Sequence, residues 1–175
     1  MLSKSRVKYI QSSNHKKLRD EEGCFLIEGP KITEEFLLHA PDQILELYAV
    51  EDWLNDNKML LKRMNPSAFF FLLTADLEKI SSRSTPNQVL AIVRKKKDPQ
   101  EITVPPGVFL MLDGIQDPGN FGTIVRIADW FGISTILCSP ECADLYNPKV
   151  VQSTMGSLLR VNVIYTNLAA WCKTN

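Results

Sequence analysis

The sequence predicts an α/β protein built from two consecutive units. Short runs of apolar, β-prone residues alternate with segments of helical periodicity along most of the 175 residues. The alternation stops at KKKDPQEITVPPG (95–107), a charged, proline-rich and aperiodic stretch that indicates a linker, and then starts again. Apolar residues make up 45% of the chain and charged residues 23%, so there is enough apolar material for ordinary globular cores.

The first unit is expected to alternate four strands with three helices. Its β-prone runs are CFLIEG (24–29), ILELYAV (44–50), AFFFLLT (68–74) and QVLAIVR (88–94). Its helical patterns are KITEEFLLHA (31–40), EDWLNDNKMLLKRM (51–64) and ADLEKISS (75–82). Pro41 ends the first of these helices, and the second has acidic residues early and basic residues late, as the helix dipole favours. Because the run at 68–74 is almost entirely apolar, we expect a buried strand there.

The second unit repeats the pattern over a shorter length. Strands are expected at 107–114, 134–139 and 159–165, with helices at 121–132 and 147–156. The chain therefore divides into residues 1–97, a linker at 98–106, and residues 107–175. A complete open α/β domain has roughly 100 to 150 residues, and three strands with two helices leave an unpaired edge and an uncovered sheet face. We expect that something else completes this unit.

Charge is distributed unevenly although the formal net charge is zero. Residues 1–97 hold 16 Lys and Arg against 13 Asp and Glu, whereas residues 98–175 hold 4 against 7. The first nineteen residues contain no Asp or Glu, and their basic side chains are Lys4, Arg6, Lys8, His15, Lys16, Lys17 and Arg19. Charge alone favours a solvated basic helix face, while a surface that contacts the phosphates of RNA is the alternative.

Several classes of protein are disfavoured by the sequence. The cysteines Cys24, Cys138, Cys142 and Cys172 lack metal-site spacing and only two histidines are present, so we expect no metal, and buried or free thiols in a reducing compartment. The first residues contain no apolar core of a secretory signal, and no apolar run approaches the roughly 20 residues of a membrane span. These observations predict a cytoplasmic protein that is not inserted in a membrane.

The stretch DPGNFGTIVRIADWFG (117–132) forms the transition from a predicted strand to a predicted helix. The chain turns at Pro118-Gly119, Asn120 is expected as the helix N-cap, and Gly132 is expected just beyond the helix end. A helical apolar stripe is expected to face the sheet, formed by Phe121, Ile124, Ala128 and Phe131. Arg126 lies about 200° around the helix from Ile124 and so points away from that stripe.

Two interpretations of this stretch stay open on the residues alone. In the structural one, Asn120 only caps the helix and Arg126 pairs with Asp129 three residues on. In the functional one, the loop binds a ligand, because α/β folds place ligands at the carboxyl ends of parallel strands. The phosphate-binding pattern GxxxxGK[ST] is absent and the glycines do not follow GxGxxG, so a nucleotide-binding α/β enzyme is disfavoured.

The same stretch also carries a family resemblance. LDGIQDPGNFGTIVRIADWFG (112–132) resembles the first signature of the SpoU, or TrmH-like, RNA ribose methyltransferases, members of the trefoil-knotted SPOUT class. NPKVVQSTMGSLLRVNV (147–163) resembles their second signature. The segments at 16–37 and 77–93 resemble their substrate-binding domain, which is similar to ribosomal RNA-binding α/β/α proteins.

The chain also departs from the family pattern. Asn87-Gln88 stands where the family often has Gln-Gly, Gln152 where arginine is common, and Asn162 where proline is common. The third signature, which supplies most of the cofactor pocket, has no counterpart before Asn175, so cofactor-binding residues are expected beyond it. The resemblance therefore implies an incomplete methyltransferase domain in the second unit.

The resemblance implies metal-independent transfer of a methyl group from S-adenosyl-L-methionine to a ribose 2′-OH of tRNA or rRNA. The catalytic positions of the family fall on Asn120 and Arg126. Because arginine keeps its proton near neutral pH, we expect Arg126 to position a phosphate and stabilise the developing oxyanion, with Asn120 holding Arg126 or the ribose. The resemblance further implies a homodimer joined through the second unit. An RNA-binding module without catalysis is the alternative function.

Overall fold

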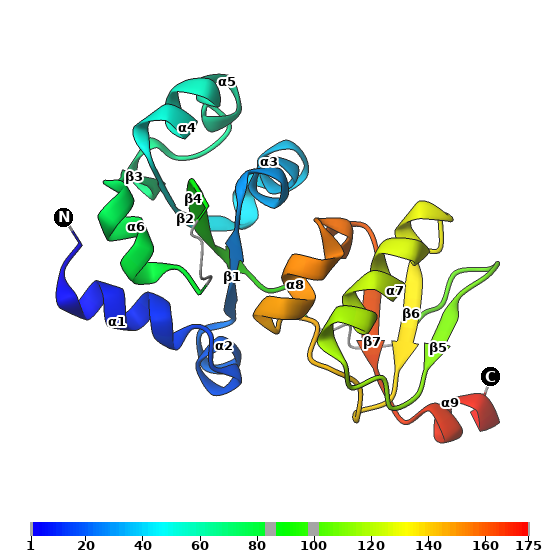
Figure 1. Ribbon diagram of the computed structural model, residues 1–175. Coiled ribbons are helices and arrows are strands. Elements are labelled where there is room, and N and C mark those ends of the chain that lie inside the picture. Colours follow the sequence, from blue (N-terminus) through cyan, green and yellow to red (C-terminus); the bar gives the residue numbers. More distant parts are fainter. Residues whose placement is uncertain (1, 83–86, 98–101, 175) are drawn as a thin grey trace. The chain divides into compact units, whose positions relative to one another are not determined.

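The computed structural model describes residues 2–82, 87–97 and 102–174, and the chain forms two compact units, Met1–Lys95 and Lys96–Asn175 (Figure 1). The domain limits drawn from the sequence stay predictions. No helix in the described ranges is long and apolar enough to cross a membrane.

The first unit is a four-stranded mixed sheet between helices. Its elements are α1 (Lys4–Ser12), α2 (Lys16–Glu22), β1 (Cys24–Glu28), α3 (Pro30–His39), η1 (Pro41–Gln43), β2 (Ile44–Ala49), α4 (Glu51–Asp56), α5 (Lys58–Leu61), η2 (Pro66–Ala68), β3 (Phe69–Phe71), α6 (Thr74–Ile80) and β4 (Val89–Arg94). The strand order is β1-β4-β2-β3, with β4 antiparallel to both neighbours and β2 parallel to β3. Strand periodicity sends alternate side chains to the two faces, so each face has its own core.

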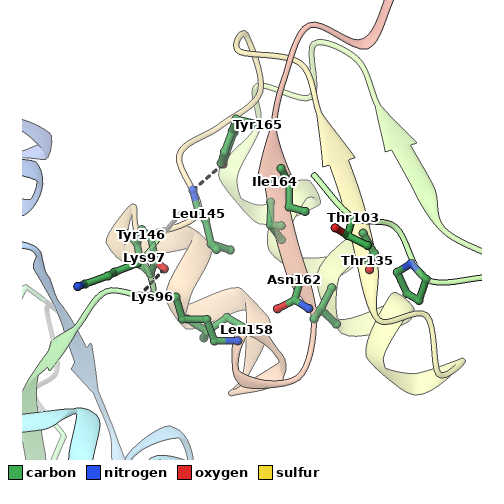
Figure 2. Close-up of a pocket in the computed structure, with 13 residues that line it drawn as sticks. Lys96, Lys97, Thr103, Thr135, Leu145, Tyr146, Leu158, Asn162, Ile164 and Tyr165 are labelled. Carbon is green, nitrogen blue, oxygen red and sulfur yellow. Dashed lines mark hydrogen bonds between the residues drawn. The ribbon is translucent and has the colours of Figure 1, made fainter. Parts of the chain in front are cut away.

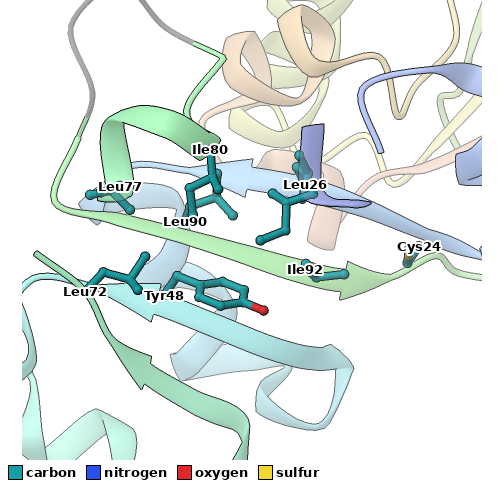
Figure 3. Packing of buried hydrophobic residues seen from close by; sticks show 9 residues of the cluster. Cys24, Leu26, Tyr48, Leu72, Leu77, Ile80, Leu90 and Ile92 are labelled. Carbon is teal, nitrogen blue, oxygen red and sulfur yellow. The ribbon is translucent and has the colours of Figure 1, made fainter. Parts of the chain in front are cut away.

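One face of this sheet packs on α1 and α6. This side holds one buried cluster (Figure 3). The sheet contributes Leu26, Tyr48, Leu90 and Ile92, and the rest of the unit contributes Ile10, Leu72, Leu77 and Ile80. The other face packs on α3, where the rings of Phe25 and Phe36 meet edge to face at 6.1 Å. The α/β/α layering expected for this unit is confirmed.

Three details of the first unit differ from the sequence prediction. The helix expected at 51–64 is two short helices, α4 and α5, that meet at Asn57, whose side-chain amide donates to the Trp53 carbonyl at 3.0 Å. The strand expected to be buried at 68–74 is the three-residue edge strand β3, where Phe70 is 41% and Phe71 53% exposed. The segment before β1, whose charge favoured a basic helix face without defined bounds, forms two separate helices, α1 and α2.

The second unit has a parallel sheet in the order β5-β6-β7. Its elements are β5 (Leu110–Leu112), α7 (Pro118–Trp130), β6 (Thr135–Cys138), α8 (Pro148–Thr154), η3 (Ser157–Leu159), β7 (Asn162–Tyr165) and α9 (Leu168–Thr174). Within the described residues, β5 and β7 each pair on one side only. Because parallel strands joined in sequence by right-handed crossovers put their helices on one face, α7 and α8 lie side by side.

The last helix, α9, covers part of the opposite face. Trp171 meets Phe109 edge to face at 5.6 Å, and the Cys172 sulfur lies 4.0 Å from that of Met111. Phe109 and Met111 are two residues apart and therefore share one face of the β5 segment. The sequence prediction contained no helix here.

Candidate functional site

The N-terminus of α7 is capped by Asp117 and not by Asn120. A carboxylate oxygen of Asp117 accepts a hydrogen bond from the Asn120 backbone amide at 2.7 Å, and Pro118 occupies the first helical position. Proline suits that position because its missing N–H would have no intrahelical partner. The prediction of Asn120 as the N-cap is therefore wrong. The exposed Asn120 side chain has no hydrogen-bond partner among the residues that the structure describes, so it is available to a ligand.

The C-terminus of α7 ends as the sequence predicts. Gly132 adopts φ 71°, and its amide donates to the Asp129 carbonyl at 3.1 Å. The next amide, that of Ile133, donates to the Ala128 carbonyl at 2.8 Å. This pair of bonds is a Schellman motif, which requires a left-handed residue such as glycine at this place. Both ends of the helix are therefore fixed by side-chain or backbone caps.

The buried face of α7 differs in part from the predicted stripe. Phe121, Val125 and Ala128 are fully buried, together with Gly122. Phe131, expected in the stripe, is 73% exposed because it lies past the last helical turn and leaves the helical register. A Cβ on Gly122 would lie 2.5 Å from the Ser153 Cβ and 2.8 Å from the Val150 carbonyl oxygen, so only glycine lets α7 approach α8 this closely.

Arg126 does not pair with Asp129. The Asp129 carboxylate is held by Arg160, with Nε to Oδ1 at 3.0 Å and Nη2 to Oδ2 at 2.8 Å, a two-pronged arrangement. The hydrogen bond from Arg160 is the main cause that lowers the pKa of the Asp129 carboxyl. The structural interpretation of Arg126 is therefore wrong. Its side chain is exposed and makes no ion pair or hydrogen bond within the described ranges.

The structure places Asn120 and Arg126 on one helix but does not join them. Six residues along an α-helix correspond to about 120° around the axis and about 9 Å along it. No hydrogen bond connects the two side chains in the described part of the chain. A contact of the Asn120 side chain with the Arg126 side chain is therefore not observed.

A turn after β6 holds the loop that leads into α7. Ser139 Oγ accepts from the Gly114 amide at 3.0 Å, and Cys142 Sγ accepts from the Ile115 amide at 3.3 Å. The same sulfur lies 3.2 Å from the Leu112 carbonyl oxygen, to which its S–H donates. From the sequence alone, Cys142 was interpreted only as a buried or free thiol. Its place four residues after Cys138, at the predicted strand end, was the available signal.

The predicted RNA-contacting side chains fall into two groups. The first group is exposed on α1, on α2 and in the turn between them, and consists of Lys4, Lys8, His15, Lys16 and Lys17. Arg19 is 2% exposed and donates to the Asn14 carbonyl, and the guanidinium of Arg6 pairs with Glu46 and bonds Tyr48. The exposed group can meet a polyanion directly, whereas Arg6 and Arg19 are occupied inside the unit. The described residues contain no cluster of three His, Cys, Asp or Glu side chains that could hold a metal ion.

A cavity of about 390 Å³ lies against β7, within the second unit (Figure 2). Lys96 lines this cavity, and its Nζ donates to the Leu159 carbonyl at 2.9 Å. Burial lowers the pKa of this ammonium group. The Tyr165 hydroxyl accepts from the Leu145 amide at 2.8 Å and donates to the Ala143 carbonyl at 2.6 Å. Burial raises the pKa of Tyr165, so these groups serve as fixed hydrogen-bond partners. No sequence motif pointed to this cavity.

Comparison with known protein families identifies relatives of both units. Residues 107–175 match the SpoU rRNA methylase family, and residues 4–91 match the MRM3-like substrate binding domain. The chain belongs to the SpoU methylase family. The resemblance inferred from the two signatures and the predicted mixed α/β fold are thereby confirmed.

Individual SpoU relatives extend well beyond this chain. A 23S rRNA (guanosine(2553)-2′-O)-methyltransferase of Bacillus subtilis is 28% identical over 95% of this chain and 64% of its own length. A putative RNA methyltransferase of the TrmH family from Porphyromonas gingivalis superposes with a TM-score of 0.85 at 33% identity, over 99% of this chain and 68% of its own. An rRNA methyltransferase from Sinorhizobium meliloti with bound AdoMet gives 0.83 at 25%, over 99% and 66%. The chain thus spans about two thirds of these relatives.

Proposed function

We propose that this protein transfers the methyl group of S-adenosyl-L-methionine to a ribose 2′-OH of tRNA or rRNA. The observation that carries the proposal is Arg126, a cation on a helix capped at both ends, with no partner in the described part of the chain. No hydrogen bond or ion pair within the described residues gives this arginine a structural role. The names of SpoU relatives that act on the 2′-O of rRNA supply the substrate class.

The side chains of α7 suit the handling of a ribose phosphate. The methyl donor supplies an activated methyl group: a C–O bond forms at the ribose 2′-oxygen, the C–S bond of the sulfonium breaks and leaves a neutral thioether, and the proton of the 2′-OH passes to solvent water. Arg126 offers a planar set of N–H donors to the target phosphate and to the 2′-oxygen as negative charge develops there. It is not assigned as the proton acceptor, because a guanidinium has no acceptor site. Asn120 offers both an amide donor and an acceptor to the ribose hydroxyls.

The residues present fit the methyl donor only in part. The loop after β5 lies at the carboxyl edge of a parallel sheet, where α/β folds hold nucleotide-like ligands. A Cβ on Gly114 would meet no atom within 4 Å, so this backbone is open to a ligand. The loop supplies backbone and open space rather than a set of donors. We therefore assign no side chain of the described residues to the donor.

A second copy of the chain is proposed to complete the site. Next to Arg126, α7 exposes Ile127, Trp130 and Phe131, which are 48%, 85% and 73% accessible. Three large apolar side chains at one helix end form a surface suited to burial against a partner. A homodimer joined through this helix would bring the Arg126 of one copy beside the partner's surface. The cytoplasmic location stays a prediction from the sequence.

Methyl transfer is tested with S-adenosyl-L-methionine labelled on its methyl group and unmodified tRNA and rRNA. We expect label in RNA, at positions where alkaline cleavage is blocked, because that cleavage needs a free 2′-OH. Label on a base would contradict the ribose assignment. RNA binding without any label would favour the alternative, a non-catalytic RNA-binding module, which the exposed lysines of the first unit suit equally well but which leaves Arg126 without a task.

A further inference from the structure

The start of α8 packs against the first turns of α7 at two glycines. A Cβ on Gly122 would lie 2.8 Å from the Val150 carbonyl oxygen. A Cβ on Gly119 would lie 3.9 Å from Cε of the Lys149 side chain. The two helices lie side by side within the second unit (Figure 1). The Lys149 side chain therefore extends over the start of α7, and its ammonium group is bonded directly to the Cε atom at that place.

The backbone of Lys149 is fixed while its ammonium group is unpaired. Asn147 caps α8 by accepting a hydrogen bond from the Lys149 amide at 2.9 Å, and Pro148 occupies the first helical position. The Ser153 hydroxyl donates to the Lys149 carbonyl at 2.8 Å. The side chain is exposed, and its Nζ makes no hydrogen bond or ion pair with another described residue. α8 thus holds a cation against α7 without giving it a partner in the described part of the chain.

Asp117 is an acidic residue beside this ammonium group. Its Oδ1 would lie 3.1 Å from the same Gly119 Cβ, but it accepts the Asn120 amide and forms no ion pair with Lys149. A structural explanation is that Lys149 only offsets the charge of this helix cap. The attraction between two exposed charges contributes little to stability, so it leaves the cation available to a stronger acceptor. A phosphate oxygen is an acceptor of that kind.

Lys149 and Arg126 lie on the same side of α7. Gly119, over which Lys149 lies, precedes Arg126 by seven residues, which is within about 20° of two full turns and about 10 Å along the axis. Both cations are exposed and unpaired among the described residues. A single phosphate is too small to span that distance, whereas successive phosphates of one strand present a row of negative charges. The two side chains therefore suit two phosphates of the same RNA strand rather than one isolated anion.

We propose that Lys149 binds a phosphate of the substrate RNA next to the one held by Arg126. The inference rests on the proposed function and adds a contact from α8 that fixes the register of the strand, so that the target ribose and not its neighbour lies at Arg126. A lysine ammonium group binds phosphate as a point charge, without the planar geometry of arginine. Lys149 therefore strengthens binding of the strand before and during the reaction, whereas Arg126 also acts on the charge that develops in the transition state.

The test measures binding of the 175-residue chain to unmodified tRNA and rRNA transcripts over a series of salt concentrations. Lys149→Met keeps an unbranched side chain over Gly119 and removes the charge. We expect it to weaken both complexes about 2- to 5-fold at low salt and to reduce the slope of log K against log salt concentration by about 0.7 to 0.9, the value of one phosphate contact. Lys149→Arg is expected to retain the slope. In methyl-transfer assays, Lys149→Met raises KM for RNA more than it lowers kcat, and Arg126→Ala does the reverse.

Matched variants separate a phosphate contact from general effects. Lys173→Met removes an exposed lysine of the same unit from α9, on the other face of the sheet from α7 and α8, and is expected to leave the slope unchanged. If Lys149 only offsets the charge of Asp117, Lys149→Met lowers the melting temperature and leaves the slope unchanged, which overturns the inference. Because Arg126 and Lys149 meet different phosphates, the double variant is expected to lose two contacts from the slope. Loss of only one contact would show a shared phosphate and overturn the proposed register.

The outcomes distinguish this inference from the proposed function. If Lys149→Met keeps the wild-type slope, or if Lys173→Met reduces the slope equally, the phosphate contact is wrong, while methyl transfer from the labelled donor to RNA stands on its own measurement. Absence of RNA binding by the wild type would overturn the proposed function and the phosphate contact together.

Discussion

Replacing Arg126 by alanine separates catalysis from folding in this protein. Arg126 is exposed on α7 and makes no ion pair in the described ranges, so its truncation leaves neither a core cavity nor an orphaned charge. Surface changes of that kind alter the free energy of unfolding by within about 0.5 kcal/mol. Loss of one donor that faces developing negative charge lowers a rate by about 100- to 1000-fold, or about 2.7 to 4 kcal/mol of transition-state stabilisation. The expected loss of transition-state stabilisation is therefore several times larger than the expected change in the free energy of unfolding.

The assay pairs single-turnover methyl transfer with thermal unfolding of the same protein preparations. Arg160→Ala is the matched control, because it removes an arginine from the same unit that is fully engaged with Asp129. We expect Arg160→Ala to lower the stability by about 1 kcal/mol and to change the rate less than Arg126→Ala does, since Arg126 itself stays in place even where the freed Asp129 pairs with it. An Arg126→Ala protein with the wild-type rate would refute the catalytic role and leave the helix as a packing element.

Three further predictions concern the corner itself. Asp117→Ala is expected to lower the free energy of unfolding by about 1 kcal/mol while Asn120→Ala stays within about 0.5 kcal/mol, and equal losses in denaturant titrations would contradict the observed cap. Gly122→Ala is expected to lower the free energy of unfolding by about 1 to 3 kcal/mol, since its Cβ would lie 2.5 Å from a side chain of α8. An unchanged denaturation midpoint would show that α7 and α8 can move apart without cost. The folded-state pKa of Asp129 is lowered by Arg160, so its stabilisation is full above the unfolded value of about 3.9 and is lost as pH falls through the lower folded value. Asp129→Asn is expected to remove the part of the free energy of unfolding that is lost at low pH, as measured by melting curves at several pH values. Identical pH profiles for the wild type and the variant would contradict a stabilising role of the Asp129–Arg160 pair.

The local sequence pattern was sufficient to predict most strands and helices, but not to predict which of them are buried. CFLI and VLAIV are continuous apolar runs, and in β1 and β4 they are buried as such runs predict. FFF is equally apolar, yet β3 lies at the edge of the sheet, because strand order depends on pairing between distant segments. The break at Asn57 depends on one side chain that competes for a helix carbonyl, which periodicity does not register.

The candidate site shows the same division between local and distant information. DPGN offers two capping residues, and the proline after Asp117 was a local signal for the correct one, because proline favours the first helical position. The partner of Asp129 could not be found locally. Arg126 has the right spacing on the helix, but Arg160, the residue directly after η3, reaches the carboxylate with a two-pronged geometry. Likewise, the contacts of Ser139 and Cys142 with the loop after β5 join segments about 25 to 30 residues apart.

The distribution of constraints around α7 explains how an unpaired arginine can be useful. The helix start is fixed by Asp117, its end by Gly132, and the loop before it by Ser139 and Cys142. Because the backbone has so many fixed points, the only large freedom left to Arg126 is rotation of its own side chain. A donor on a rigid element keeps its direction when charge develops, whereas a donor on a mobile loop must be reordered at a cost in rate. An ion pair with Asp129 would have occupied Arg126, and Arg160 removes that competition by holding the carboxylate itself.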